Sequence, residues 1–176
     1  MNIYEKKNIG DILAECAYPG RGIVAGLSEN ERYAAFAYFI MGRSGNSRNR
    51  VFRSDGETVT IYPFDESKVS DPSLIIYSPV RKVGDRLVVT NGDQTDTVCS
   101  FLERGSTFEA ALETREFEPD VPNFTPRISA MLDLGKDFSY RMSILKSADE
   151  NGSACCRFTY AFPGVPGLGH FIHTYA

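Results

Sequence analysis

The stretch YPGRGIVAGLSENERYAAFAYFIMGRSGNSRNR, residues 18–50, decides how the rest of the chain can fold. It holds two apolar runs of strand length, residues 23–27 and 33–41, joined by the polar segment 28–32. Two such runs around a short polar turn are typical of a β-hairpin, and a hairpin brings its two outer ends together. We therefore expect Arg21 and the loop 43–50 to meet at one end of a sheet.

The same stretch is rich in arginine. No lysine occurs between Lys7 and Lys68, whereas arginines stand at positions 21, 32, 43, 48, 50 and 53. Guanidinium groups bind phosphate or carboxylate through paired hydrogen bonds, and the Gly, Ser and Asn residues in between add backbone N–H groups and small donors. The pattern favours an anion pocket for a phosphorylated small molecule. The alternative is a hairpin end whose arginines are merely solvated.

Composition describes an ordinary protein of one domain, residues 1–176. The chain is 42% hydrophobic and 24% charged, with a formal net charge of −4. This acidic overall field repels nucleic acid, so the arginine cluster favours a small anion over a polyanion. No apolar run reaches the ~20 residues of a membrane span, and residues 1–10 are charged rather than signal-like. These features predict a cytoplasmic location with no membrane partner.

Cysteine and histidine usage gives no sign of a metal site. The four cysteines lack metal-ligand spacing, and the vicinal pair would point to opposite faces of a strand. We expect all of them to be reduced and mostly buried: Cys16, Cys99, Cys155 and Cys156. The only histidines, His170 and His173, are more typical of an edge strand than of a catalytic pair. Proton transfer elsewhere must then use Tyr, Asp, Glu or bound water.

Beyond the hairpin the chain is predicted to contain mostly strands. A short helix is expected at residues 9–16, before Pro19 and Gly20. The further strands are expected at residues 51–53, 58–62, 74–78, 86–90, 127–132, 138–146, 154–162 and 170–175. Many antiparallel-looking strands with helices grouped near the middle predict the α+β class.

The middle of the chain changes from strand to helix periodicity. After residue 96 the apolar positions follow a helical period until Gly105 ends the helix. A capping-box pattern from Ser106 to Glu109 predicts a second helix at residues 108–114. Residues 115–126 contain three prolines that exclude a helix. We expect this segment to run extended past a site.

Four motifs, in order along most of the chain, point to one family. They are YPGRG at 18–22, GRS at 42–44 with SRNR at 47–50, NGDQTD at 91–96 and EPDVPNFTPR at 118–127. Together they resemble the archaeal-type inosine monophosphate (IMP) cyclohydrolase family and its bacterial relatives. The resemblance implies a four-layer αββα sandwich of mainly antiparallel sheets, like that of N-terminal-nucleophile hydrolases but without self-processing. The start Met1-Asn2 agrees, because it offers no terminal Ser, Thr or Cys.

The resemblance also implies an enzyme of purine biosynthesis, in the cyclic-amidine C–N hydrolase class. Its substrate would be 5-formamidoimidazole-4-carboxamide ribotide (FAICAR), whose carboxamide nitrogen attacks the formyl carbon and loses water to give IMP. Because this closure is intramolecular, holding the two groups in near-attack geometry supplies much of the catalysis. A nitrogen must lose a proton and a carbonyl oxygen must gain one, which calls for acid and base groups and for no cofactor.

Two groups of residues are predicted to carry this chemistry. The phosphate pocket is assigned to Arg21, Arg43, Ser44, Arg48 and Arg50. Proton transfer and carbonyl polarisation are assigned to Tyr38, Asn91, Asp93 and Asp96, and contact with the base to Glu118, Asn123 and Arg127.

Structural alternatives compete with several of these assignments. Tyr38 could be a core residue of the second hairpin strand. Asp93 and Asp96 could cap the helix that begins there, and the Asn-Gly pair before them could simply form a turn. Arg127 enters a strand directly from a loop and is expected to have a partner, for which Asp120 is a candidate.

The sequence stops earlier than the family pattern. Members generally continue beyond the region 169–175, whereas this chain ends at Ala176. Either a final strand and helix are missing, or the site is completed by another chain or not at all. Unpaired edge strands would favour a homo-oligomer.

Three functions are therefore open. The first is an IMP cyclohydrolase, and the second is a catalytically inactive purine-nucleotide-binding protein of the same fold. The third, a hydrolase with Cys16 or a serine as nucleophile, ranks last because nothing pairs such a nucleophile with a histidine.

Overall fold

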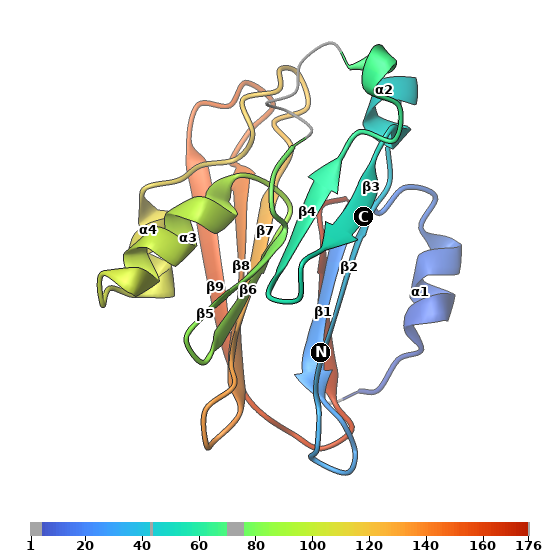
Figure 1. Ribbon diagram of the computed structural model, residues 1–176. Coiled ribbons are helices and arrows are strands. Elements are labelled where there is room, and N and C mark those ends of the chain that lie inside the picture. The colour runs from blue at the N-terminus through green and yellow to red at the C-terminus, as the bar shows by residue number, and fades with distance from the viewer. Residues whose placement is uncertain (1–4, 43, 70–75, 176) are drawn as a thin grey trace.

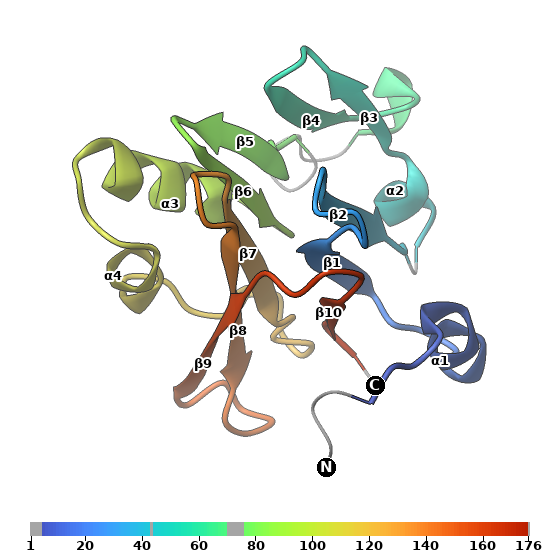
Figure 2. The ribbon, with the colours of Figure 1, turned by 90° about the horizontal axis from the view of Figure 1, so that it is seen from below.

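Two β-sheets pack face to face in the computed structural model, which describes residues 5–42, 44–69 and 76–175 (Figures 1 and 2). Every pairing between the named strands is antiparallel. The predicted α+β class with mainly antiparallel sheets is confirmed.

The predicted hairpin makes most of the smaller sheet. β1 (Arg21–Leu27) pairs with β2 (Ala34–Ile40), and β10 (Gly169–His173) pairs on the other side of β1. Arg21 lies opposite Ile40, so it stands at the end where the chain leaves β2 for the arginine-rich loop. That loop contains the short helix α2 (Gly45–Arg48), which the sequence did not predict.

The larger sheet has the strand order β3-β4-β5-β6-β7-β8-β9. Its strands are β3 (Val51–Ser54), β4 (Thr58–Tyr62), β5 (Val80–Val83), β6 (Arg86–Thr90), β7 (Arg127–Asp133), β8 (Ser139–Ser147) and β9 (Cys155–Pro163). The 3-10 helix η1 (Glu66–Lys68) follows β4.

The predicted strand at residues 74–78 is wrong. Positions 74 and 75 lie outside the described residues, and residues 76–78 form no strand. The ladder starts only at Val80, because Pro79 has no N–H to donate to it. The Tyr77 carbonyl still accepts the N–H of Ile61 at 2.9 Å, so this segment runs beside β4 and carries Tyr77 towards the smaller sheet.

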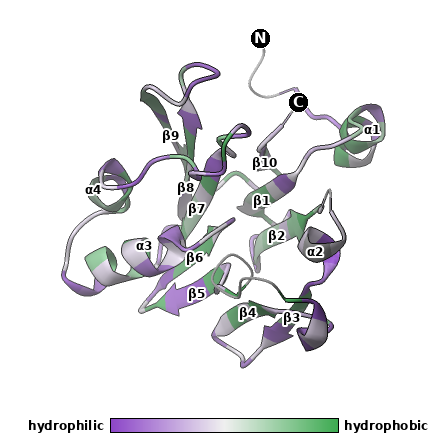
Figure 3. Cartoon of the chain, turned by 90° about the horizontal axis from the view of Figure 1, so that it is seen from above, coloured by the Kyte–Doolittle hydropathy of each residue, from purple (hydrophilic) through white to green (hydrophobic). Residues whose placement is uncertain are grey.

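The inner faces of the two sheets form the main core. Alternation along β1 turns Ile23 and Ala25 inward, where they pack with Ile128, Ala130 and Leu132 of β7. All five side chains are inaccessible to solvent. Figure 3 shows hydrophobic residues on β1, β2, β6 and β7, the strands at the middle of the molecule.

Two helices cover the outer face of the larger sheet (Figure 1). α3 (Gln94–Glu103) and α4 (Phe108–Glu113) bury Val98 and Phe108 against Met131. The predicted capping box is displaced by one residue, because Thr107 rather than Ser106 accepts the hydrogen bond, from the N–H of Ala110 at 3.1 Å.

The helix α1 (Ile9–Glu15) forms as predicted, beside the smaller sheet (Figure 1), and none of its residues is buried. Three layers are therefore well packed: α3 with α4, the seven-stranded sheet and the three-stranded sheet. Of the described helices, none is long and apolar enough to cross a membrane. The four cysteines are free thiols, but only Cys99 is buried, so the prediction that most of them are buried is wrong.

Candidate active site

Six side chains from separate elements converge at the end of the sandwich where β1 begins. We call them the Arg–Tyr–Glu cluster: Arg21, Tyr38, Arg50, Tyr77, Glu118 and Arg127. Arg21 interacts electrostatically with Glu118 and with both tyrosines. Glu118 interacts in turn with Arg21, Arg50 and Arg127. The predicted meeting of Arg21 with the arginine-rich loop is therefore made by Arg50, the last residue before β3.

The two tyrosines form a hydrogen-bonded pair. The hydroxyls of Tyr38 and Tyr77 lie 2.9 Å apart. Burial raises the pKa of both phenols, and it raises the pKa of Tyr38 well above its usual value although Arg21 and Arg50 oppose the shift. Both groups stay neutral at physiological pH and can donate or accept a hydrogen bond. The Tyr38 ring also packs edge-on against Phe52, at 5.9 Å between centroids, so this residue has a packing role as well.

The Arg21 guanidinium has hydrogen-bond donors that the described residues do not use. Its Nε is shielded from solvent, and the guanidinium has no hydrogen-bond or ion-pair partner among the described residues. Burial acts to lower the pKa of Arg21, but Glu118 and the nearby phenols outweigh it and raise the pKa, so the group keeps its charge. A buried donor without a protein partner calls for a ligand or solvent partner.

Glu118 lies on the segment 115–126, which the sequence analysis predicted to run extended alongside a site. Its backbone N–H donates to the carbonyl of Thr125 at 2.9 Å, and Phe117 packs edge-on against Phe124, so the segment closes on itself. Burial raises the pKa of Glu118, while Arg21, Arg127 and Arg50 act in the opposite direction. A carboxylate whose pKa is raised is a stronger base than an ordinary carboxylate, which favours a role in proton transfer.

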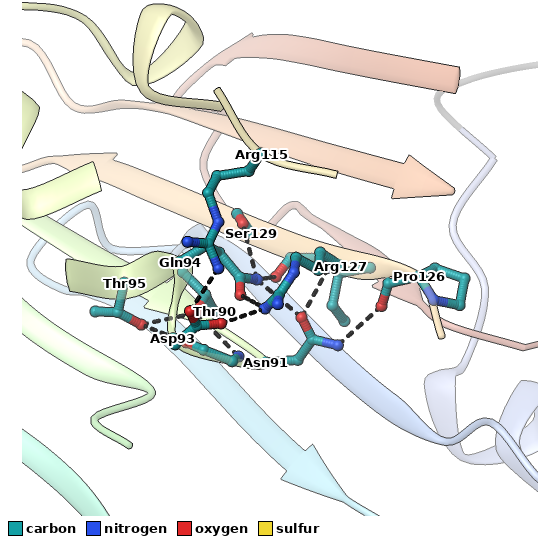
Figure 4. Close-up of polar contacts among 11 residues, drawn as sticks. Thr90, Asn91, Asp93, Gln94, Thr95, Arg115, Pro126, Arg127 and Ser129 are labelled. Atoms are coloured by element: carbon teal, nitrogen blue, oxygen red, sulfur yellow. Dashed lines mark hydrogen bonds and ion pairs between the residues drawn. The ribbon is translucent and has the colours of Figure 1, made fainter. Parts of the chain in front are cut away.

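A polar network holds the cluster residue Arg127 (Figure 4). Nη1 of Arg127 lies 2.7 Å from Asp93 Oδ1 and donates to Gln94 Oε1 at 2.7 Å. Burial acts against ionisation, but hydrogen bonds from Arg115 and Arg127 hold the pKa of Asp93 below its usual value. The partners of Arg127 are thus Asp93 and Gln94, and the prediction of Asp120 as a candidate partner is wrong.

Asn91 is built into the same network (Figure 4). Its Oδ1 accepts the N–H of Ile128 at 2.9 Å, and its Nδ2 donates to the carbonyl of Pro126 at 2.9 Å. Only 1% of Asn91 is exposed. These bonds tie the end of β6 to the start of β7 and so fix where Arg127 leaves the sheet.

Comparison with known proteins identifies the family of the chain. A family model described as "IMP cyclohydrolase-like protein" matches residues 18–176. The chain belongs to the IMP cyclohydrolase-like family. The match begins at Tyr18 and includes all six residues of the Arg–Tyr–Glu cluster.

Curated relatives carry the name IMP cyclohydrolase. The chain is 36% identical over 128 residues to the protein of Methanococcus maripaludis strain C6, covering 70% of this chain and 61% of the relative. It is 34% identical over 120 residues to that of Methanopyrus kandleri (66% and 59%) and 32% identical over 118 residues to that of Methanocaldococcus jannaschii (66% and 57%). The chain thus spans about three fifths of the length of these relatives.

Several predicted site residues of this family member lie outside the cluster. Asp96 is exposed on α3 and pairs with Arg81 at 2.7 Å. Three more of the predicted site residues are also exposed: Ser44, Arg48 and Asn123. Arg43 lies outside the described residues. Both histidines lie on β10, an edge strand as predicted.

Tyr77 is the one cluster residue that sequence reasoning missed. It belongs to the apolar run assigned to a strand, and nothing in its immediate sequence distinguishes it from a packing residue. Asp93 was predicted as catalytic or capping, yet its side chain makes no helix-capping hydrogen bond and instead binds two arginines.

Gly92 gives the Arg127 network the space that it needs. A Cβ at this position would lie 2.6 Å from Arg127 Nη1 and 2.7 Å from Gln94 Oε1. We therefore expect Gly92→Ala to separate these two side chains and to lower the free energy of unfolding by about 1–2 kcal/mol. Urea unfolding measures the change.

Gly45→Ala is the matched control, because a Cβ there meets no atom within 4 Å. Equal stability of the two alanine variants would contradict the role given to Gly92.

Proposed function

We propose that this chain catalyses the reaction for which its relatives are named, closing FAICAR to IMP with loss of water. The observation that carries the proposal is the charged Arg21 guanidinium, whose buried Nε makes no hydrogen bond within the described residues, beside the half-buried Glu118 carboxyl group. Membership in the IMP cyclohydrolase-like family supports it. The two packed antiparallel sheets are compatible with an architecture like that of N-terminal-nucleophile hydrolases.

Substrate binding is assigned to the arginines of the cluster. Arg21 and Arg50 bind the 5′-phosphate through charge-assisted hydrogen bonds, and Arg127 binds the carboxamide end. Ser44 and Arg48, exposed on the α2 loop, form the outer rim of the phosphate subsite. A ligand held at both ends keeps its formyl and carboxamide groups in contact, which favours intramolecular attack.

Proton transfer is assigned to Glu118 and the tyrosine pair. As the carboxamide nitrogen bonds to the formyl carbon, the Glu118 carboxylate takes a proton from that nitrogen. The Tyr38 hydroxyl, held by Tyr77 at 2.9 Å, donates a hydrogen bond to the formyl oxygen as charge develops on it. The protonated Glu118 returns this proton to the formyl oxygen, which becomes a hydroxyl group. Glu118 then takes the proton of the former formamide nitrogen and gives it to that hydroxyl group, so that water leaves as the C–O bond breaks and the ring C=N bond forms.

The test is direct. The purified chain is incubated with FAICAR, and the ultraviolet absorbance is followed as the purine ring forms. We expect IMP to accumulate and to be identified by chromatography. Binding of IMP without any turnover would replace the proposal with a nucleotide-binding protein that lacks the activity.

A further inference from the structure

Three charged side chains, Asp93, Arg115 and Arg127, form a bridge (Figure 4). Arg115 Nη2 lies 2.5 Å from Asp93 Oδ2, and Arg127 Nη1 lies 2.7 Å from Asp93 Oδ1. The Arg127 side chain is 9% exposed and the Arg115 side chain 25%. Two guanidinium groups on one carboxylate leave this bridge with a net positive charge of one.

The bridge adjoins Glu118 at two places. Arg115 is on the same segment, three residues earlier in the chain. Arg127 and Glu118 approach the same point beside Gly92, where a Cβ would lie 2.6 Å from Arg127 Nη1 and 3.6 Å from Glu118 Oε1. Nη1 is bonded to Asp93 and Gln94, and within the described residues Arg127 and Glu118 interact through charge and not through a hydrogen bond.

We propose that Asp93 and Arg115 are positioning residues for Glu118. Asp93 competes with Glu118 for the charge of Arg127, and Arg115 weakens this competition because it pairs with Asp93. Their charges have opposite signs, so removing them has opposite consequences. Without the charge of Asp93, two unshared guanidinium groups stand behind Glu118 and favour its ionised form. Without Arg115, Asp93 neutralises Arg127 completely and the protonated form of Glu118 is favoured.

The other charged and titratable groups around Glu118 come from four places. Arg21 lies on β1, Arg50 precedes β3, Tyr77 precedes β5 and Asp120 is on the same segment. None of them contacts Asp93 or Arg115 through a hydrogen bond or ion pair in the described part of the chain. Substitutions in the bridge therefore leave these neighbours in place.

The backbone of the segment is held independently of the Arg115 side chain. Arg157 donates to the Arg115 carbonyl at 2.9 Å, and the Glu118 N–H donates to the Thr125 carbonyl at 2.9 Å. A change at the Arg115 side chain thus removes a charge and leaves these two backbone contacts available.

The experiment measures the titration of Glu118 itself, in the full chain labelled with carbon-13 at the glutamate carboxyl carbons. The Glu118 signal is assigned by its loss in Glu118→Gln. We expect Asp93→Asn to lower the titration midpoint and Arg115→Met to raise it, each by at least about 0.3 pH unit, a factor of about two in the proton dissociation constant. The control is Arg104→Met, an exposed arginine at the other end of α3, which should not move the midpoint.

Midpoints that move in the same direction, or no further than in Arg104→Met, would overturn the inference. A purely structural role gives no reason for shifts of opposite sign. If Asp93→Asn does not fold, the direction of the Arg115→Met shift decides alone. The inference rests on the proposed function only for its catalytic consequence. Opposite midpoint shifts in a chain that does not convert FAICAR would support the role of Asp93 and Arg115 and would contradict the proposed activity.

Discussion

Replacing Arg21 with methionine is expected to lower kcat/KM for FAICAR by about 10²–10⁴-fold. One charge-assisted hydrogen bond contributes about 1.5–3 kcal/mol, and a guanidinium can make two to one phosphate. Methionine replaces the apolar stem of the arginine side chain and removes the guanidinium group with its charge and donors. The loss is measured by steady-state turnover followed in the ultraviolet.

The stability of this variant separates a binding role from a structural one. The Arg21 guanidinium has no hydrogen-bond partner among the described residues, so we expect the free energy of unfolding to change by less than about 1 kcal/mol. Arg32→Met, in the exposed turn at the far end of the same hairpin, is the matched control and should keep full activity. An unstable but active Arg21→Met protein would mean that Arg21 supports the fold rather than the substrate.

Glu118→Gln is expected to lower kcat by about 10²–10⁴-fold, the range that general acid–base catalysis supplies, and to make the protein more stable at pH 7–8. Burial raises the pKa of Glu118, so the folded state favours the protonated carboxyl. That preference stabilises the fold fully below the unfolded-state pKa and is lost as the pH rises through the folded-state pKa. Above that pH the wild type holds a buried charge that the glutamine lacks.

Unfolding in urea at pH 4 and pH 8 tests the second half of this prediction. We expect wild type and Glu118→Gln to differ at pH 8 and to converge near pH 4, where glutamate in the unfolded chain is about half protonated. Glu116→Gln is the control, since Glu116 is exposed and pairs with Arg157 only at 3.7 Å. Full activity in Glu118→Gln would contradict the acid–base role of Glu118. Lower stability of this variant at pH 8 would contradict the cost assigned to the buried charge.

Local sequence chemistry was enough to predict the frame of the fold. The hairpin β1–β2 has strand-length apolar runs around a polar turn, and both helices α3 and α4 begin and end close to the expected positions. The misplaced strand at residues 74–78 has an equally local cause: apolar composition favours a strand, but Pro79 delays the ladder to Val80.

The site was less predictable because it depends on contacts between distant segments. Arg21 and Arg50 stood out as arginines of one motif-rich stretch, whereas Tyr77 enters the cluster only through its hydrogen bond to Tyr38, 39 positions away. Asp93 begins a helix, which made capping a reasonable prediction. Its actual partners come from two other segments, and no spacing rule connects them.

The central claim is that the purine ribotide binds in the Arg–Tyr–Glu cluster, and a crystal structure of the chain with IMP tests it most directly. We predict density for the nucleotide with an oxygen about 3 Å from the Arg21 guanidinium and the purine ring facing Glu118. IMP bound at any other surface, with Arg21 and Glu118 free of it, would contradict the account.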